Sequence, residues 1–133
     1  MKNFNIKIPS DKLLISKVSS DFSDFLHSNE IKKLDAFQIA FEEALTNSIV
    51  HGNKNNPDKN VHIYSYIGDK SIKVIIEDEG EGFDYCLAII GLTESQDNIY
   101  KNNGRGIFLI SLYTDDFYFE DNGRKIVMLK NIN

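Results

Sequence analysis

Glu43 and Asn47 lie four positions apart in a stretch from 37 to 50 whose only charged residues are Glu42 and Glu43. The spacing puts Glu43 and Asn47 on one face of a helix, with His51 one further turn along. An amide oxygen is a suitable ligand for Mg²⁺, and a nearby carboxylate can act as a general base toward a hydroxyl or water. Two solvated side chains, or a hydrogen bond between them, explain the same spacing, so this helix alone leaves both interpretations open.

Asp78 ends a run of alternating apolar residues that reads as a strand. The period of two places its carboxylate on the same side as Ile72, Val74 and Ile76, which is the expected core face. An inward-pointing carboxylate needs hydrogen-bond donors, and the exocyclic amine of adenine is one such donor. The alternative is that Asp78 caps the glycine-rich turn that follows it.

Two pairs of glycines follow. Gly80 and Gly82 allow the backbone to approach a flat base closely or to adopt a positive φ. Gly104 and Gly106 stand where a helix is expected to begin, and free N–H groups at such a position favour phosphate. Arg105, between them, is a candidate contact for a terminal phosphate.

Other site signatures are missing from the sequence. It has no GxGxxG motif leading from a strand into a helix and no GxxxxGK[ST] motif, which excludes the Rossmann and P-loop interpretations. It also has no HExxH motif and no Cys/His cluster, and its three histidines lack the spacing of metal ligands.

The elements that position these residues follow from periodicity. Apolar residues at helical spacing predict a first helix that ends near Ser28. A second helix is expected from residue 29 or 30 to His51, with Gly52 just beyond its end. A third is expected over 106–113.

Alternation predicts short strands around these helices, one near the N-terminus, a pair joined at Gly68, and a C-terminal hairpin closed by residues 121–123. The stretch from about 84 to 103 contains an apolar run and is expected to be a mobile lid. The predicted architecture is α+β, with one mixed or largely antiparallel sheet of about five strands and helices on one face.

Composition narrows the class of protein. A length of 133 residues with 41% hydrophobic content favours a single domain, 1–133, with a real core. A net charge of −5 argues against a nucleic-acid partner. The single cysteine, the lack of a signal peptide and the absence of a membrane-length apolar stretch predict a cytoplasmic protein without a membrane partner.

The three segments, taken in order, resemble the motifs of the GHKL ATPases with the Bergerat nucleotide fold, and within them the anti-sigma-factor serine kinases. Residues 43–47 with His51 resemble the N box, 78–84 the G1 box and 103–110 the G2 box. The resemblance implies a two-layer α/β sandwich. Sensor histidine kinases share these boxes, but they carry a helical dimerisation module for which this chain has no space.

The resemblance also implies roles. Glu43 is expected to be the general base, Asn47 the magnesium ligand and Asp78 the adenine acceptor, with ATP and Mg²⁺ as cofactors. The residues expected to bind the cofactor are Asn47, Asp78, Gly80, Gly82, Gly104, Arg105 and Gly106.

The implied function is an ATP- and Mg²⁺-dependent protein serine/threonine kinase. It would phosphorylate an anti-sigma-factor antagonist and sequester a partner such as a sigma factor, with a homodimer as one option for its assembly. The alternative is a nucleotide-gated binding module without phosphoryl transfer. Glu43 favours the enzyme, because a pure switch needs no base.

Overall fold

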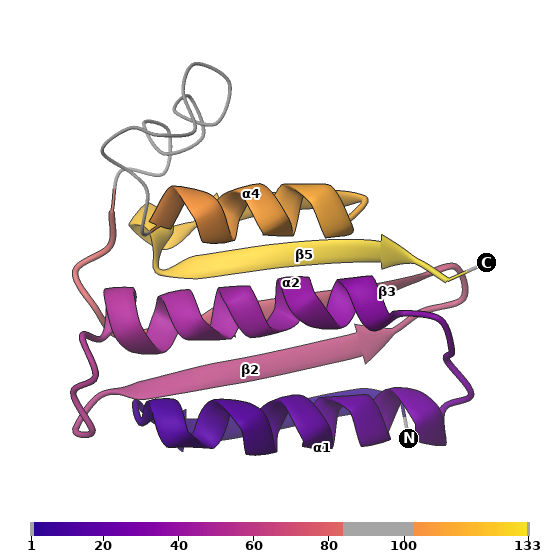
Figure 1. Ribbon diagram of the computed structural model, residues 1–133, viewed down its shortest axis with the longest axis horizontal. Coiled ribbons are helices and arrows are strands. Elements are labelled where there is room, and N and C mark those ends of the chain that lie inside the picture. The colour runs from indigo at the N-terminus through magenta and orange to yellow at the C-terminus, as the bar shows by residue number, and fades with distance from the viewer. Residues whose placement is uncertain (1, 84–102, 133) are drawn as a thin grey trace.

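The computed structural model describes residues 2–83 and 103–132, and within them one antiparallel sheet of five strands forms the base of the fold (Figure 1). The strands are β1 (Asn3–Pro9), β2 (Asn60–Ile67), β3 (Ser71–Glu77), β4 (Asp116–Glu120) and β5 (Lys125–Asn131). Their order in the sheet is β1-β2-β3-β5-β4, and every neighbouring pair is antiparallel. The prediction of a largely antiparallel sheet is confirmed.

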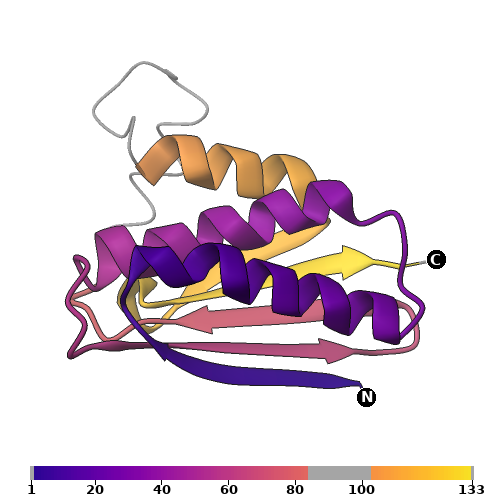
Figure 2. The ribbon, with the colours of Figure 1, turned by 60° about the horizontal axis from the view of Figure 1, so that its bottom comes forward.

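Three α-helices cover one face of this sheet, so the described residues form two layers (Figure 2). They are α1 (Ile15–Ser28), α2 (Asp35–Thr46) and α4 (Asn103–Tyr113). Shorter helical segments are the 3-10 turns η1 (Lys12–Leu14) and η3 (Asp121–Gly123) and the π-helical η2 (Asn47–Gly52), which continues α2. The α+β class with helices on one face is confirmed.

The core lies between the two layers. Alternate residues of β2 and β3 point toward the helices and are buried, as the period of two predicts. Phe22 of α1 and Phe41 of α2 stack with ring centroids 4.1 Å apart, which joins these two helices above the sheet. Several large side chains are fully buried there, namely Phe22, Phe37, Phe41, Leu45, Ile49, Ile63, Ile72, Ile76, Ile110 and Met128.

The second helix differs from its predicted bounds at both ends. It begins at Asp35 rather than at residue 29 or 30, because Glu30 and Lys33 have φ angles of 62° and 64°, which a right-handed helix cannot accommodate. At the other end α-helical geometry stops at Thr46 and gives way to η2. Gly52 is therefore the last residue of η2, and Asn53 caps it.

The predicted lid falls almost wholly outside the described residues, which exclude 84–102. Asn103, its last predicted residue, is the first residue of α4, so this helix begins three positions before the predicted start at Gly106. Helical periodicity could not locate this start, because the glycines and polar residues at 102–106 carry no apolar pattern.

Candidate functional site

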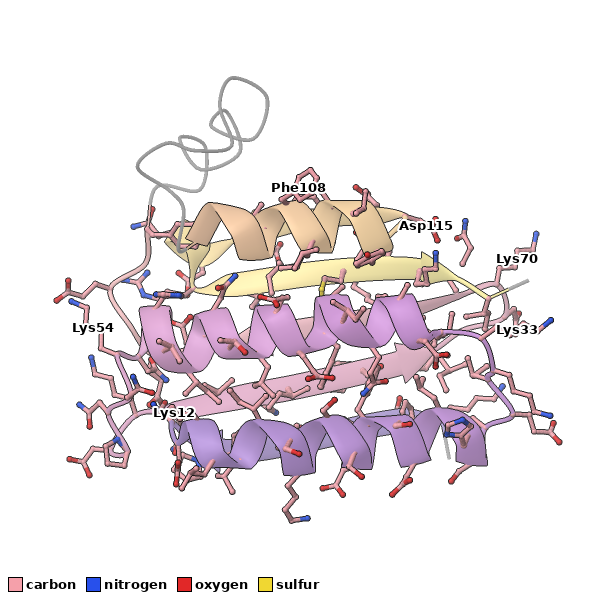
Figure 3. All side chains as sticks on the ribbon, in the orientation of Figure 1. Lys12, Lys33, Lys54, Lys70, Phe108 and Asp115 are labelled. Atoms are coloured by element: carbon pink, nitrogen blue, oxygen red, sulfur yellow. The ribbon has the colours of Figure 1, made fainter. Side chains whose placement is uncertain are left out.

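A pocket opens where η2, the end of β3 and the β4–β5 turn meet. Lys54, which follows η2, marks that end of the molecule in Figure 3. The residues that line the pocket are Ala44, Asn47, Ser48, His51, Gly52, Asp78, Gly82, Phe83, Phe119, Gly123, Arg124 and Ile126.

Asp78 is the acid of this pocket. Its side chain lies on the core face just past β3, as predicted, and the residue is only 7% exposed. Its Oδ1 atom accepts a hydrogen bond from the Gly80 N–H at 2.9 Å. Burial raises the pKa of Asp78 to about 6, because it disfavours the charged form more strongly than the Gly80 hydrogen bond and the positive charge of Arg124 favour it.

Two glycines fit closely around this carboxylate. A Cβ atom on Gly52 would lie 2.3 Å from Asp78 Oδ2, and one on Gly80 would lie 2.1 Å from the Gly52 carbonyl oxygen. Neither position has room for a side chain. The backbone of η2 therefore lies directly against Asp78, which also lines the pocket.

Glu43 and Asn47 meet α4 at Gly106. A Cβ atom on Gly106 would lie 3.2 Å from Glu43 Oε2 and within 3.1 to 3.2 Å of both amide atoms of Asn47. The two side chains thus share one helix face, as predicted, and that face is turned toward the N-terminal part of α4. Within the described part of the chain the Asn47 backbone N–H donates to the Glu43 carbonyl oxygen, but no hydrogen bond joins the two side chains. The geometry therefore does not support a pairing of the Glu43 carboxylate with the Asn47 amide.

Gly82 is held by the β4–β5 turn. It has a φ of +84°, and a Cβ atom there would lie 2.3 Å from the Asn122 carbonyl oxygen. The next residue, Phe83, donates its N–H to the same oxygen at 3.0 Å, and its ring packs edge-on against Phe119 with centroids 5.2 Å apart. The turn therefore forms one wall of the pocket and fixes the glycine segment.

Sequence reasoning missed two residues of this region. Arg124 lines the pocket and donates from Nε to the Gly80 carbonyl oxygen at 2.6 Å. Asn53, 2% exposed, accepts from the Glu79 N–H at 2.9 Å and donates to the Asn60 carbonyl oxygen at 2.9 Å. Both act on backbone atoms far away in the sequence, and no local motif signals such contacts.

The roles of the remaining predicted site residues stay predictions. Gly104 and Arg105 lie in the first turn of α4, the helix start expected to favour phosphate, but the Arg105 side chain is outside the described structure. His51 lines the pocket from η2. Among the described residues no group of three or more His, Cys, Asp or Glu side chains could hold a metal ion by itself.

Comparisons with known proteins agree with the fold. Residues 8–130 match the family described as histidine kinase-like ATPase domain. The serine-protein kinases RsbW of Staphylococcus aureus strains JH9 and Newman are each 35% identical to the chain over 101 residues. The match covers 71% of this chain and 64% of each relative, so it spans a little under two thirds of their length. In the described part of the chain, no helix has the length and apolar character to cross a membrane.

Proposed function

The chain belongs to the histidine kinase-like ATPase family and is homologous to a serine-protein kinase, and from this premise we propose that it is itself an ATP- and Mg²⁺-dependent protein serine/threonine kinase. One observation carries the proposal. Asp78 lines the pocket and is buried against Gly52 and Gly80. Asn47 lines the same pocket, and it meets Gly106 of α4 together with Glu43. The proposed adenine acceptor therefore follows β3 and lies against η2, while the proposed phosphate-handling pair lies where α2 continues into η2.

The roles follow from the chemistry of each group. Asp78 accepts a hydrogen bond from the adenine amine, while Gly80 and Gly82 allow the base to approach the backbone. Asn47 supplies an amide oxygen to Mg²⁺, which when bound neutralises phosphate charge. Gly104, Arg105 and Gly106 contact the phosphates at the start of α4.

Glu43 separates a kinase from a passive nucleotide switch. In the proposed reaction the oxygen of a substrate serine forms a bond to the γ-phosphorus, the bond to the β-phosphate oxygen breaks, and ADP leaves. The serine proton passes to the Glu43 carboxylate. Binding ADP or ATP requires no such base, so a carboxylate that faces the same helix start as Asn47 favours the enzyme.

The proposed substrate is a small cytoplasmic protein with an acceptor serine, of the anti-sigma-factor-antagonist type, and the proposed sequestered partner is a sigma factor. The name serine-protein kinase of the relatives supports this substrate class. A homodimer is one option for its assembly. The alternative, a nucleotide-gated module without transfer, remains the opposing outcome of the test.

Calorimetry with ADP, with and without Mg²⁺, tests the nucleotide site. GDP is the control because guanine carries an oxygen at C6, where adenine carries the amine that Asp78 would bind. We expect ADP to bind with Mg²⁺ and GDP to bind at least about tenfold more weakly, the value of one lost hydrogen bond to a charged group. Failure to bind ADP would refute the proposed function. Binding without transfer of labelled phosphate to the serine protein would leave the nucleotide-gated module.

A further inference from the structure

Arg124 lies directly opposite Asp78, just beyond the last regular pair of β3 and β5. The Asp78 N–H donates to the Arg124 carbonyl oxygen at 2.9 Å, one step beyond the pair Glu77 and Lys125. Side chains of such directly opposed residues lie on the same face of the sheet. The Arg124 guanidinium and the Asp78 carboxylate therefore both belong to the pocket side, and both line the pocket.

The guanidinium joins two segments by three backbone contacts. Nε donates to the Gly80 carbonyl oxygen at 2.6 Å, and Nη2 donates to that of Glu81 at 3.2 Å. Nη1 donates to the Asp121 carbonyl oxygen at 3.2 Å and lies 3.6 Å from the Asp121 carboxylate. One planar group thus ties the glycine segment to the β4–β5 turn. A lysine ammonium has no such fork of fixed donors.

Arg124 is also the strongest of the charged groups that favour ionised Asp78. Lys59 acts in the same direction, while Glu77 acts against it. His51 lines the same pocket from η2. Because burial opposes ionisation of Asp78, a positive charge on the adjacent strand has a direct effect on the fraction of Asp78 that can accept a hydrogen bond.

We propose that Arg124 is a positioning residue for adenine recognition, which braces the Gly80–Glu81 backbone through its fork of donors and keeps the Asp78 carboxylate in its ionised, accepting form. This inference rests on the proposed nucleotide site. The planar donors of Arg124 and its positive charge have separate consequences. The donors set the shape of the loop, and the charge sets the pH range over which Asp78 accepts.

Two substitutions separate these consequences. Arg124→Gln removes the charge and most of the fork, whereas Arg124→Lys keeps the charge and loses the fork. The matched control is Lys130→Gln, which removes a cation with similar side-chain exposure, 29% against 30% for Arg124. Lys130 pairs with Asp115 near the far end of β5, whereas Arg124 immediately precedes that strand. None of the three substitutions removes a backbone hydrogen-bonding group of the sheet.

The first readout is the titration of the Asp78 carboxyl by NMR in the nucleotide-free protein. Arg124→Gln should shift its midpoint upward by about one unit, the effect of losing an adjacent opposite charge. Arg124→Lys and Lys130→Gln should leave it close to the wild-type midpoint. A midpoint unmoved in Arg124→Gln would overturn the electrostatic role, whether or not the protein binds nucleotide.

The second readout is ADP affinity between pH 5.5 and 8. Arg124→Lys should weaken ADP several-fold at every pH, and Arg124→Gln should weaken it further and move the acidic loss of affinity to higher pH. An ADP affinity unchanged in Arg124→Lys would overturn the bracing role. If Arg124→Gln does not fold, Arg124→Lys alone tests this role. If the wild-type protein binds no ADP, the proposed function is refuted. The effect of Arg124 on Asp78 is still decided by the titration of Asp78 in the nucleotide-free protein.

Discussion

Gly52 lies directly against Asp78, so that a single methyl group at position 52 would come within 2.3 Å of the Asp78 Oδ2 atom. Contacts this short do not occur in folded proteins, and one of the two groups must move. The carboxylate is the group able to move, because it ends a side chain, whereas Gly52 is part of the helical backbone of η2. The position of the proposed adenine acceptor is therefore set by a glycine on another element.

Gly52→Ala should impair nucleotide binding more than folding. Displacing the Asp78 carboxylate removes a charge-assisted hydrogen bond worth roughly 1.5–3 kcal/mol, which corresponds to about a 10- to 100-fold loss of ADP affinity. Calorimetry measures the affinity, and thermal unfolding reports on the fold. Gly68→Ala is the matched control, since its Cβ would meet the nearest atom at an ordinary 3.4 Å. Equal ADP affinity in both variants would contradict the prediction.

Asp78→Asn should weaken ADP binding and, at the same time, stabilise the nucleotide-free protein. Asparagine keeps an oxygen for the Gly80 N–H, but it presents an amide donor where the adenine amine needs an acceptor. The buried charge disappears, and the raised pKa of about 6 corresponds to a gain on the order of 2–3 kcal/mol at neutral pH. Chemical denaturation without nucleotide measures the gain. A less stable variant would show that the charged carboxylate contributes to folding.

The stabilising effect of Asp78→Asn should depend on pH. Because the pKa of Asp78 is raised from 3.8 to about 6 in the folded protein, the folded state takes up a proton first as the pH falls. The cost of the buried charge is thus fully present above pH 6 and is relieved between pH 6 and about 4. The difference in unfolding free energy between variant and wild type should shrink over that window. A constant difference would mean that Asp78 does not titrate there.

The location of Asp78 was predictable because a strand's alternation extends one residue past its last regular pair. Ile72, Val74 and Ile76 determine the face on which Asp78 lies. The common face of Glu43 and Asn47 followed from helical spacing in the same way, although the helix changes to π geometry at Asn47. Local sequence patterns were therefore sufficient to predict the fold class and the position of Asp78.

Arg124 and Asn53 were not predictable by these means. Each contributes through side-chain bonds to backbone atoms of a different segment, such as Arg124 to Gly80 or Asn53 to Glu79. Neither the residue type nor its neighbours in the sequence distinguish such a contact from an ordinary surface side chain. The contact becomes visible only when the sheet register places the segments side by side.

Asn53→Ala should destabilise the fold around the pocket. Its amide group bonds the Glu79 N–H, the Asn60 carbonyl oxygen and the Ser10 hydroxyl, and it is almost fully buried. Loss of these bonds leaves buried polar groups unpaired, which we expect to cost about 2–4 kcal/mol of unfolding free energy. Asn56→Ala is the control, because its side chain makes an exposed bond within its own loop. Similar losses in both variants would contradict a special role for Asn53.

Glu43→Gln should leave nucleotide binding nearly intact and slow phosphoryl transfer by roughly 10²–10⁴-fold, the usual contribution of a positioned general base. Asn47→Ala should impair both binding and transfer, because a lost magnesium ligand affects the phosphates before and during the reaction. The assay uses labelled ATP and a serine-bearing partner protein, with ADP affinity measured in parallel.

Glu42→Gln provides the matched control for Glu43→Gln, since the adjacent carboxylate accepts a hydrogen bond from the Ser19 hydroxyl of α1 at 2.9 Å and is thereby engaged with another helix. It should transfer phosphate at nearly the wild-type rate. If Glu43→Gln and Glu42→Gln both match wild type while transfer is measurable, Glu43 is not the base. If wild type binds both ADP and the partner but never transfers phosphate, the kinase proposal is wrong. The pocket then serves a nucleotide-gated binding protein.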